Sequence, residues 1–150
     1  MIILRTFYIF KLNKDYTLVA NKKPENIYIL LKSIYSYNKK DILVAFDLFN
    51  EICLAINIEF INKYIYDKLK KEEEYTKFKN IHMYNNFFTN ETSKMSVLKS
   101  HIRIKSNKSD NIFIKNIKDI TDLFVCDFIY DKCVFFNNTS NYDQLRQKNK

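Results

Sequence analysis

The residues that could carry catalysis or bind a metal are few in this chain and are not spaced for either task. His82 and His101 are the two histidines, and neither stands at zinc-ligand spacing from the other or from a cysteine. The three cysteines, Cys53, Cys126 and Cys133, form no C-x-x-C pair. Their odd number is typical of reduced thiols in a cytosolic protein rather than of a disulfide framework. We therefore expect no metal site and no cofactor.

The absence of glycine removes several further kinds of active site. The 150 residues contain no Gly and one Pro. Phosphate-binding loops and dinucleotide fingerprints need Gly where the backbone approaches the ligand, and a nucleophile elbow needs it in a strained turn. No argument for an enzyme or for a small-molecule substrate remains.

Two aspartates near the end of the chain could act as a general acid and base only if the fold brought them together in a pocket. Asp122 is expected at the entrance of a strand. Asp127 follows Val125 and Cys126 and precedes Phe128, and a carboxylate among such strand residues either points to solvent or is paired. We interpret Asp127 as an outward-facing residue.

The chain is basic, with a formal net charge of +8. This charge permits binding to nucleic acid or to an anionic surface. The lysines are not gathered in one block, however, so a solvated lysine-rich surface is the simpler interpretation. No apolar run is long enough to cross a membrane, and Arg5 and Lys11 interrupt the apolar N-terminus before a signal sequence can form. We expect a cytoplasmic protein that does not bind a membrane.

The first third of the chain predicts a β-hairpin followed by a helix. Residues 2–12 are apolar on both alternating faces, which is typical of a central strand. Residues 13–15 predict a turn, and residues 16–20 predict the returning strand. Pro24 favours the first turn of a helix, and an apolar stripe at helical spacing extends this helix to residue 35.

The middle of the chain is less clearly patterned. Residues 42–49 fit a helix or an extended segment equally well, and residues 52–56 predict a buried strand. Asn57 can cap a helix whose apolar face continues to Leu69. Of the following residues, 81–84 predict a short strand and 85–94 a loop.

The last third predicts strands on both sides of a short helix. Residues 95–106 indicate two short strands or one bent strand, because Ile102 and Ile104 alternate with basic residues. Ser109 or Asp110 can cap the helix. Residues 123–129 and 133–136 then predict a hairpin, with the polar residues 130–132 as its turn.

Short strands interleaved unevenly with helices predict an α+β fold rather than regular βαβ alternation. We expect a single domain over residues 1–137, a mainly antiparallel β-sheet with packed helices, followed by a polar C-terminal tail, residues 138–150. At this length one domain can bury a sizeable core.

The order of these elements resembles a known family. The matching stretches are Arg5-Thr6-Phe7-Tyr8-Ile9-Phe10, the helix that begins Asn26-Ile27-Tyr28, Met95-Ser96-Val97-Leu98-Lys99-Ser100 before His101-Ile102-Arg103-Ile104, and the strand Leu123-Phe124-Val125-Cys126-Asp127-Phe128. Together they resemble the sporulation inhibitor of replication (SirA) family of endospore-forming Firmicutes, over residues 4–137.

The resemblance implies a non-catalytic regulator that inhibits chromosome replication initiation during sporulation by binding the N-terminal domain of the initiator DnaA. It implies that Tyr16, early in the second strand of the hairpin, takes part in that contact. Leu18 and Ala20 would share its face by strand alternation, and Leu54 is a further candidate neighbour. The partner-binding residues predicted in this way are Tyr16, Leu18, Ala20 and Leu54.

A second function, from a different class, is direct binding of nucleic acid driven by the net charge of +8. The two functions differ in their response to salt. Phosphate contacts release counterions, so affinity for nucleic acid falls steeply as salt rises, whereas an apolar protein interface responds weakly.

Overall fold

The computed structural model describes residues 3–36 and 42–136. In chain order the elements are β1 (Arg5–Leu12), α1 (Lys14–Lys22), α2 (Pro24–Ser36), α3 (Ile42–Ile52), β2 (Cys53–Leu54), α4 (Ile58–Leu69), β3 (Tyr75–Phe78), β4 (Ile81–Asn86), β5 (Glu91–Val97), β6 (Ile102–Ser106), α5 (Ile112–Ile117), β7 (Leu123–Asp127) and β8 (Lys132–Phe136).

The predicted α+β class is confirmed, because the described strands join in a mainly antiparallel eight-stranded sheet. The contacts of the chain group in two compact units. Unit 1 comprises Met1–Ile9 and Ala55–Asp119, and unit 2 comprises Phe10–Leu54 and Ile120–Lys150. The predicted domain limits stay a prediction, and the C-terminal tail lies outside the described residues.

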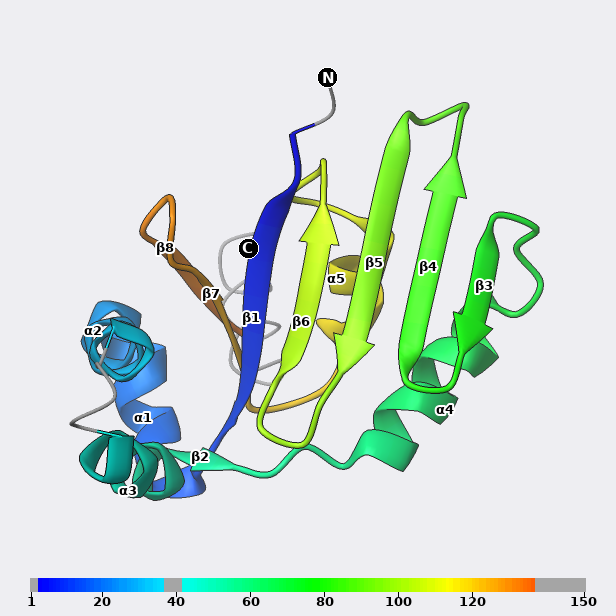
Figure 1. Ribbon diagram of the computed structural model, residues 1–150. Coiled ribbons are helices and arrows are strands. Elements are labelled where there is room, and N and C mark those ends of the chain that lie inside the picture. Colours follow the sequence, from blue (N-terminus) through cyan, green and yellow to red (C-terminus); the bar gives the residue numbers. More distant parts are fainter. Residues whose placement is uncertain (1–2, 37–41, 137–150) are drawn as a thin grey trace, which may run out of the picture. The chain divides into compact units, whose positions relative to one another are not determined.

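Unit 1 is an antiparallel sheet with helices on one face. The strand order is β3-β4-β5-β6 followed by the first residues of β1, and α4 and α5 pack on β5. Figure 1 shows both helices behind the strands, with the front of this sheet free of helices of unit 1. The covered face carries the core, because its side chains alternate with exposed ones along each strand. Its fully buried members include Met95, Ile102, Ile104, Phe113 and Ile117.

The two helices of unit 1 begin at asparagine caps. The Asn57 side chain accepts a hydrogen bond from the Phe60 backbone N–H at 3.1 Å, so this predicted cap is confirmed. The cap of α5 is Asn111, whose side chain accepts from the Ile114 N–H at 3.0 Å. The prediction of Ser109 or Asp110 at this position was wrong. Asn111 directly precedes Ile112, the first residue of α5, and so holds the cap position, whereas Ser109 and Asp110 lie further from the helix.

The predicted loop over residues 85–94 was also wrong, because these residues form most of the β4–β5 hairpin. β3 was not predicted either. The turns on both sides of β4 use non-glycine residues with positive φ, Lys79 at 55° and Asn90 at 56°, in place of the Gly that normally marks a hairpin. The two strands predicted within residues 95–106 are confirmed as the end of β5 and β6.

Unit 2 places three helices beside the other end of β1. β2 pairs with Lys11 and Leu12 of β1, and β7 pairs with β8 in the register Cys126↔Cys133. The predicted helix beginning at Pro24 and the predicted C-terminal hairpin are both confirmed, as α2 and β7–β8. The helix α2 packs on α1, α3 and β8.

The predicted returning strand at residues 16–20 was wrong, because these residues belong to α1. A hairpin here would pair them with the end of β1. That position is taken instead by β2, where Leu54 pairs with Lys11. Asn13 then begins a helix rather than a turn. The five residues Tyr16–Ala20 alone do not distinguish the two outcomes, since Thr and Val favour strands while Leu and Ala favour helices.

The ambiguous residues 42–49 are helical. They form most of α3, which continues to Ile52. The strand predicted at 52–56 is reduced to the two residues of β2, because Ile52 ends the helix and Ile56 leads into the cap of α4.

Candidate partner-binding surface

The position of α1 is fixed by Asn13. Its side chain accepts a hydrogen bond from the Asp15 N–H at 3.2 Å and so caps the helix. Its backbone N–H donates to the Ile52 carbonyl at 2.8 Å, and its Nδ2 donates to the Glu51 carbonyl at 3.4 Å. One residue therefore starts α1 and ties it to the end of α3.

Tyr16 makes a second link between the same helices. Its hydroxyl donates to Glu51 Oε1 at 2.6 Å. This hydrogen bond and the negative charge of Glu51 raise the pKa of Tyr16, because ionisation would place two negative charges together. The hydroxyl is thus already paired inside unit 2, and a partner would meet the ring of Tyr16 rather than an unpaired hydroxyl.

The four predicted binding residues lie on two neighbouring elements, α1 and β2. Tyr16 is half-buried and Leu18 is 62% exposed, while Ala20 is 1% exposed and Leu54 is 42% exposed. The common face expected from strand alternation is absent: in a helix Tyr16 and Ala20 lie on one side and Leu18 on the other. Their role in binding stays a prediction, and Ala20 would reach a partner only if α1 moved.

A cluster of exposed apolar side chains, which was not predicted, lies on α3. Ile42, Leu43, Val44 and Phe46 are 62%, 76%, 60% and 63% exposed. We call these four residues the α3 patch. They stand within the first five residues of the helix, and single exposed apolar side chains are normal on a protein surface whereas a cluster of this kind marks an interaction site.

The sequence contains a signal for this patch. Ala45, Leu48, Phe49 and Ile52 stand at i, i+3, i+4 and i+7, and they are the buried and half-buried residues of α3. One such stripe is enough to attach a helix to its core. The other apolar residues of the segment are not needed to attach the helix to the core. If residues 42–52 form a helix, these residues lie on its solvent-facing side.

A shallow pocket lies beside Leu18. It has a volume of about 270 Å³ and is lined by residues from the end of α1 and the start of α2: Leu18, Val19, Lys22, Lys23 and Asn26. The lining is mostly apolar. It offers space for one side chain of a partner, with two ammonium groups beside it.

Asp127 is a structural residue of the β7–β8 turn. It is 3% exposed, so the interpretation as an outward-facing residue was wrong. Its Oδ1 accepts from the backbone N–H groups of Ile129 at 3.2 Å and Tyr130 at 3.1 Å. A buried carboxylate of this kind closes a turn in the way an Asx-turn does.

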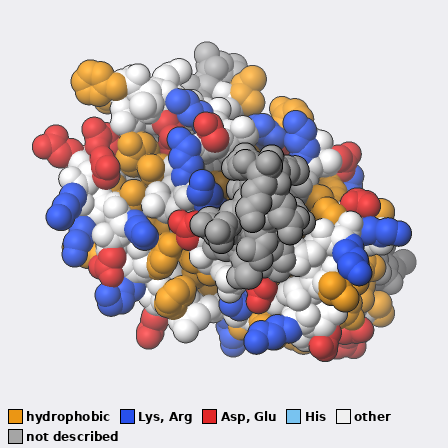
Figure 2. All heavy atoms as spheres, turned by 180° about the vertical axis from the view of Figure 1, so that it is seen from behind, with side chains coloured by type: hydrophobic (Ala, Val, Ile, Leu, Met, Phe, Trp, Pro, Cys, Tyr) orange, Lys and Arg blue, Asp and Glu red, His pale blue; other side chains and the backbone are white. Residues whose placement is uncertain are grey.

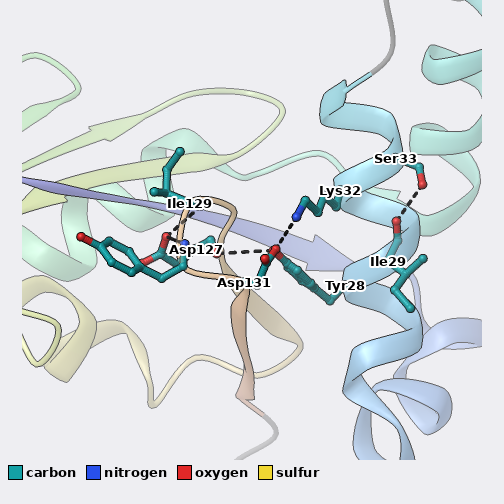
Figure 3. Close-up of polar contacts among 8 residues, drawn as sticks. Tyr28, Ile29, Lys32, Ser33, Asp127, Ile129 and Asp131 are labelled. Carbon is teal, nitrogen blue, oxygen red and sulfur yellow. Dashed lines mark hydrogen bonds and ion pairs between the residues drawn. The ribbon is translucent and has the colours of Figure 1, made fainter.

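The same turn is attached to α2 through Asp131, as Figure 3 shows. The Tyr28 hydroxyl donates to Asp131 Oδ1 at 2.7 Å, and the Lys32 ammonium donates to the same oxygen. These two hydrogen bonds lower the pKa of Asp131. Phe128 stacks on Tyr35, with ring centroids 4.7 Å apart. These contacts make Asp127 and Asp131 supports of a turn. Asp122 directly precedes β7 with a φ of 65°, at the strand entrance where it was expected.

The histidines and cysteines are placed for structure. Burial lowers the pKa of His82 to about 4 and raises the pKa of Cys53 to about 12. It also raises the pKa values of Cys126 and Cys133. A cysteine nucleophile needs a lowered pKa, so none of these thiols is activated. The ring of His101 contacts the ring of Tyr8 in a tilted arrangement, with 5.4 Å between the ring centroids.

The described residues hold neither a candidate metal cluster nor a candidate membrane-spanning helix. Over residues 3–36 and 42–136, no group of three or more His, Cys, Asp or Glu side chains is arranged to hold a metal ion. In the same ranges, no helix combines the length and the apolar character needed to cross a membrane.

The helices α1 and α3 are connected through Asn13 and Tyr16, and both carry exposed apolar side chains. No protein-family model matches the sequence, and no curated protein matches it significantly. The resemblance to the SirA family therefore stays a prediction.

Proposed function

We propose that this protein is a non-catalytic regulator that inhibits the initiation of chromosome replication during sporulation by binding the N-terminal domain of DnaA. The family resemblance supplies the identity of the partner. The single observation that carries a protein-binding role is the α3 patch, with four apolar side chains exposed in five consecutive residues. The three free thiols are typical of a cytosolic protein, and a partner in the cytoplasm agrees with this.

The α3 patch has the chemistry of an interface centre. Leu43 and Phe46 stand three residues apart and so project from the same side of the helix. Covering a large apolar side chain that is now in water contributes about 1.5–3 kcal/mol of binding free energy. A few well-buried anchors carry most of the energy at a protein interface, and Phe46 is the candidate aromatic anchor of this patch.

The helix α1 would give the interface its specificity. Leu18 and the pocket beside it stand on the exposed side of α1. The hydrogen bond from Tyr16 to Glu51 and the bonds of Asn13 to the end of α3 hold the two helices in a fixed relation. A partner that contacts both helices would therefore meet a preformed surface, which lowers the cost of ordering on binding.

The test is a calorimetric titration of the full chain with the DnaA N-terminal domain of the same organism. The variants are Leu43→Ser combined with Phe46→Ser, and Leu18→Ser alone. The matched control is Phe87→Ser, because Phe87 is 98% exposed and lies in unit 1 rather than on α1 or α3.

We expect the double variant to lose about 2 kcal/mol or more of binding free energy and to keep its thermal unfolding temperature, since neither side chain is in the core. The Leu18 variant should lose less, and the control should bind normally. Wild-type protein that does not bind the domain, or a double variant that binds as well as the control, would refute the proposal.

A further inference from the structure

The sheet face of unit 1 opposite α4 and α5 has an unusual set of side chains. Cross-strand partners point to the same side of a sheet, so the register identifies its members. One row across the strands is Thr76, Met83, Lys94, Lys105 and Thr6, and the next is Phe78, Ile81, Ser96, Arg103 and Tyr8. We call these two rows the open face, since no helix of unit 1 covers it (Figure 1).

The charges of the open face are all positive. Lys94 stands directly opposite Lys105, and Arg103 is two residues from Lys105 on the same side of β6. None of the strand residues in the two rows is Asp or Glu. In the described part of the chain, no ion pair involves any of these three cations.

Like charges directly opposite each other destabilise a sheet. The repulsion between Lys94 and Lys105 therefore lowers the stability of the folded protein. An anion bound between the two ammonium groups would neutralise this repulsion. The helix-covered side of unit 1 differs. There, basic and acidic side chains are interspersed (Figure 2), as in the ion pair of Lys63 with Asp67 on α4. The two rows of the open face, by contrast, carry cations and no anions.

Aromatic rings stand in the same row as the arginine. Phe78 is 71% exposed, and the Lys79 ammonium lies 5.5 Å from its ring centroid. Tyr8 lies at the other end of the row. Four strand spacings separate the two, about 19 Å. Exposed rings beside cations on an open sheet are the features that let bases stack while their phosphates are neutralised.

We propose that the open face binds single-stranded RNA. Lys94, Lys105 and Arg103 contact phosphates, and Phe78 stacks on a base. A sheet surface that carries exposed rings can accept the splayed bases of a single strand. The hydroxyls of Thr6 and Thr76 border the same face and can exchange hydrogen bonds with ribose 2′-hydroxyls, which distinguishes RNA from DNA. This activity is separate from the protein contact on unit 2.

The test measures fluorescence anisotropy of a labelled oligouridylate of about 12 nucleotides with the full chain, at several salt concentrations. The variant is Lys94→Gln with Lys105→Gln. The matched control is Lys68→Gln with Lys115→Gln, which removes the same charge from exposed positions on α4 and α5. Phe78→Ala tests stacking. Thermal unfolding of each variant verifies its folding.

We expect the open-face variant to bind at least about tenfold more weakly, and its salt slope to fall by about 1.4, since each phosphate contact on a single strand contributes about 0.7. The control should bind within twofold of wild type, and Phe78→Ala should lose about fivefold. Equal weakening of both double variants would overturn the proposal, as would equal binding of poly-L-glutamate. Equal affinity for the corresponding DNA would overturn the assignment to RNA.

Discussion

His82 should make the folded protein sensitive to mild acid. It is fully buried, and its two ring nitrogens lie 2.7 Å from the Tyr75 hydroxyl and 2.7 Å from Asn62 Oδ1. The amide oxygen can only accept, so Nε2 carries the proton and Nδ1 accepts from Tyr75. Adding a second proton would displace the tyrosine hydrogen and bury a charge, with Lys77 opposite on β3.

These effects lower the pKa of His82 from 6.5 to about 4. A depressed histidine pKa means that the unfolded chain binds the proton more tightly than the folded chain. The contribution to stability is therefore complete above pH 6.5 and is lost as the pH falls from 6.5 to 4. With these two pKa values, linkage predicts a loss of about 2 kcal/mol of unfolding free energy between pH 7 and pH 5.

Urea unfolding of wild-type protein and of His82→Gln, at pH 7, 6 and 5, measures this loss. Glutamine cannot titrate but keeps a donor and an acceptor. It should be less stable than the wild type at pH 7, because its geometry satisfies Tyr75 and Asn62 less well, and the difference should shrink by about 2 kcal/mol at pH 5. Parallel pH curves for the two proteins would show that His82 titrates normally and would refute the reasoning.

Three other substitutions test the local structure, each by chemical unfolding. Asn13→Ala removes the cap of α1 and should cost about 1 kcal/mol; an unchanged midpoint would contradict the capping role. Lys79→Gly relieves a positive φ of 55° and should stabilise by up to about 1 kcal/mol; destabilisation would count against this reasoning. Asp127→Ala removes the acceptor of two backbone N–H groups of the β7–β8 turn and should cost about 1–3 kcal/mol, whereas an unchanged stability would contradict its structural role.

The helices and strands that could be predicted are those whose own residues show a clear hydrophobic pattern. The helices α2 and α4 have apolar stripes of helical period, and each begins with a residue that favours a helix start, Pro24 or Asn57. The strand β1 is apolar on both alternating faces, which is typical of a central strand, and it has a neighbouring strand on each side in the sheet order.

The parts that failed depend on residues far away in the sequence or on unusual turn chemistry. Residues 16–20 form a helix because β2, more than thirty residues later, pairs with the end of β1. The β4–β5 hairpin lacks the usual sequence signal of a turn, because Asn90 occupies the left-handed conformation in place of Gly. The α3 patch could not be predicted because residues 42–49 fit a helix and an extended segment equally well.

The open face of unit 1 cannot be predicted from the sequence, because it depends on the register of the strands. Lys94 and Lys105 are eleven positions apart in the sequence, and only the pairing of β5 with β6 sets them opposite each other. In the sequence alone they are two of many dispersed lysines, which indicate a solvated surface rather than a site.

The most direct test of the proposed function is hydrogen–deuterium exchange of the full chain, alone and with an excess of the DnaA N-terminal domain of the same organism. We predict slower exchange on α3, above all around the α3 patch, and on α1. The backbone amides of the sheet of unit 1, and those around Phe87, should exchange at the same rate with and without the domain. Exchange that does not change on adding the domain, or protection confined to unit 1, would contradict a regulator that binds DnaA through α1 and α3.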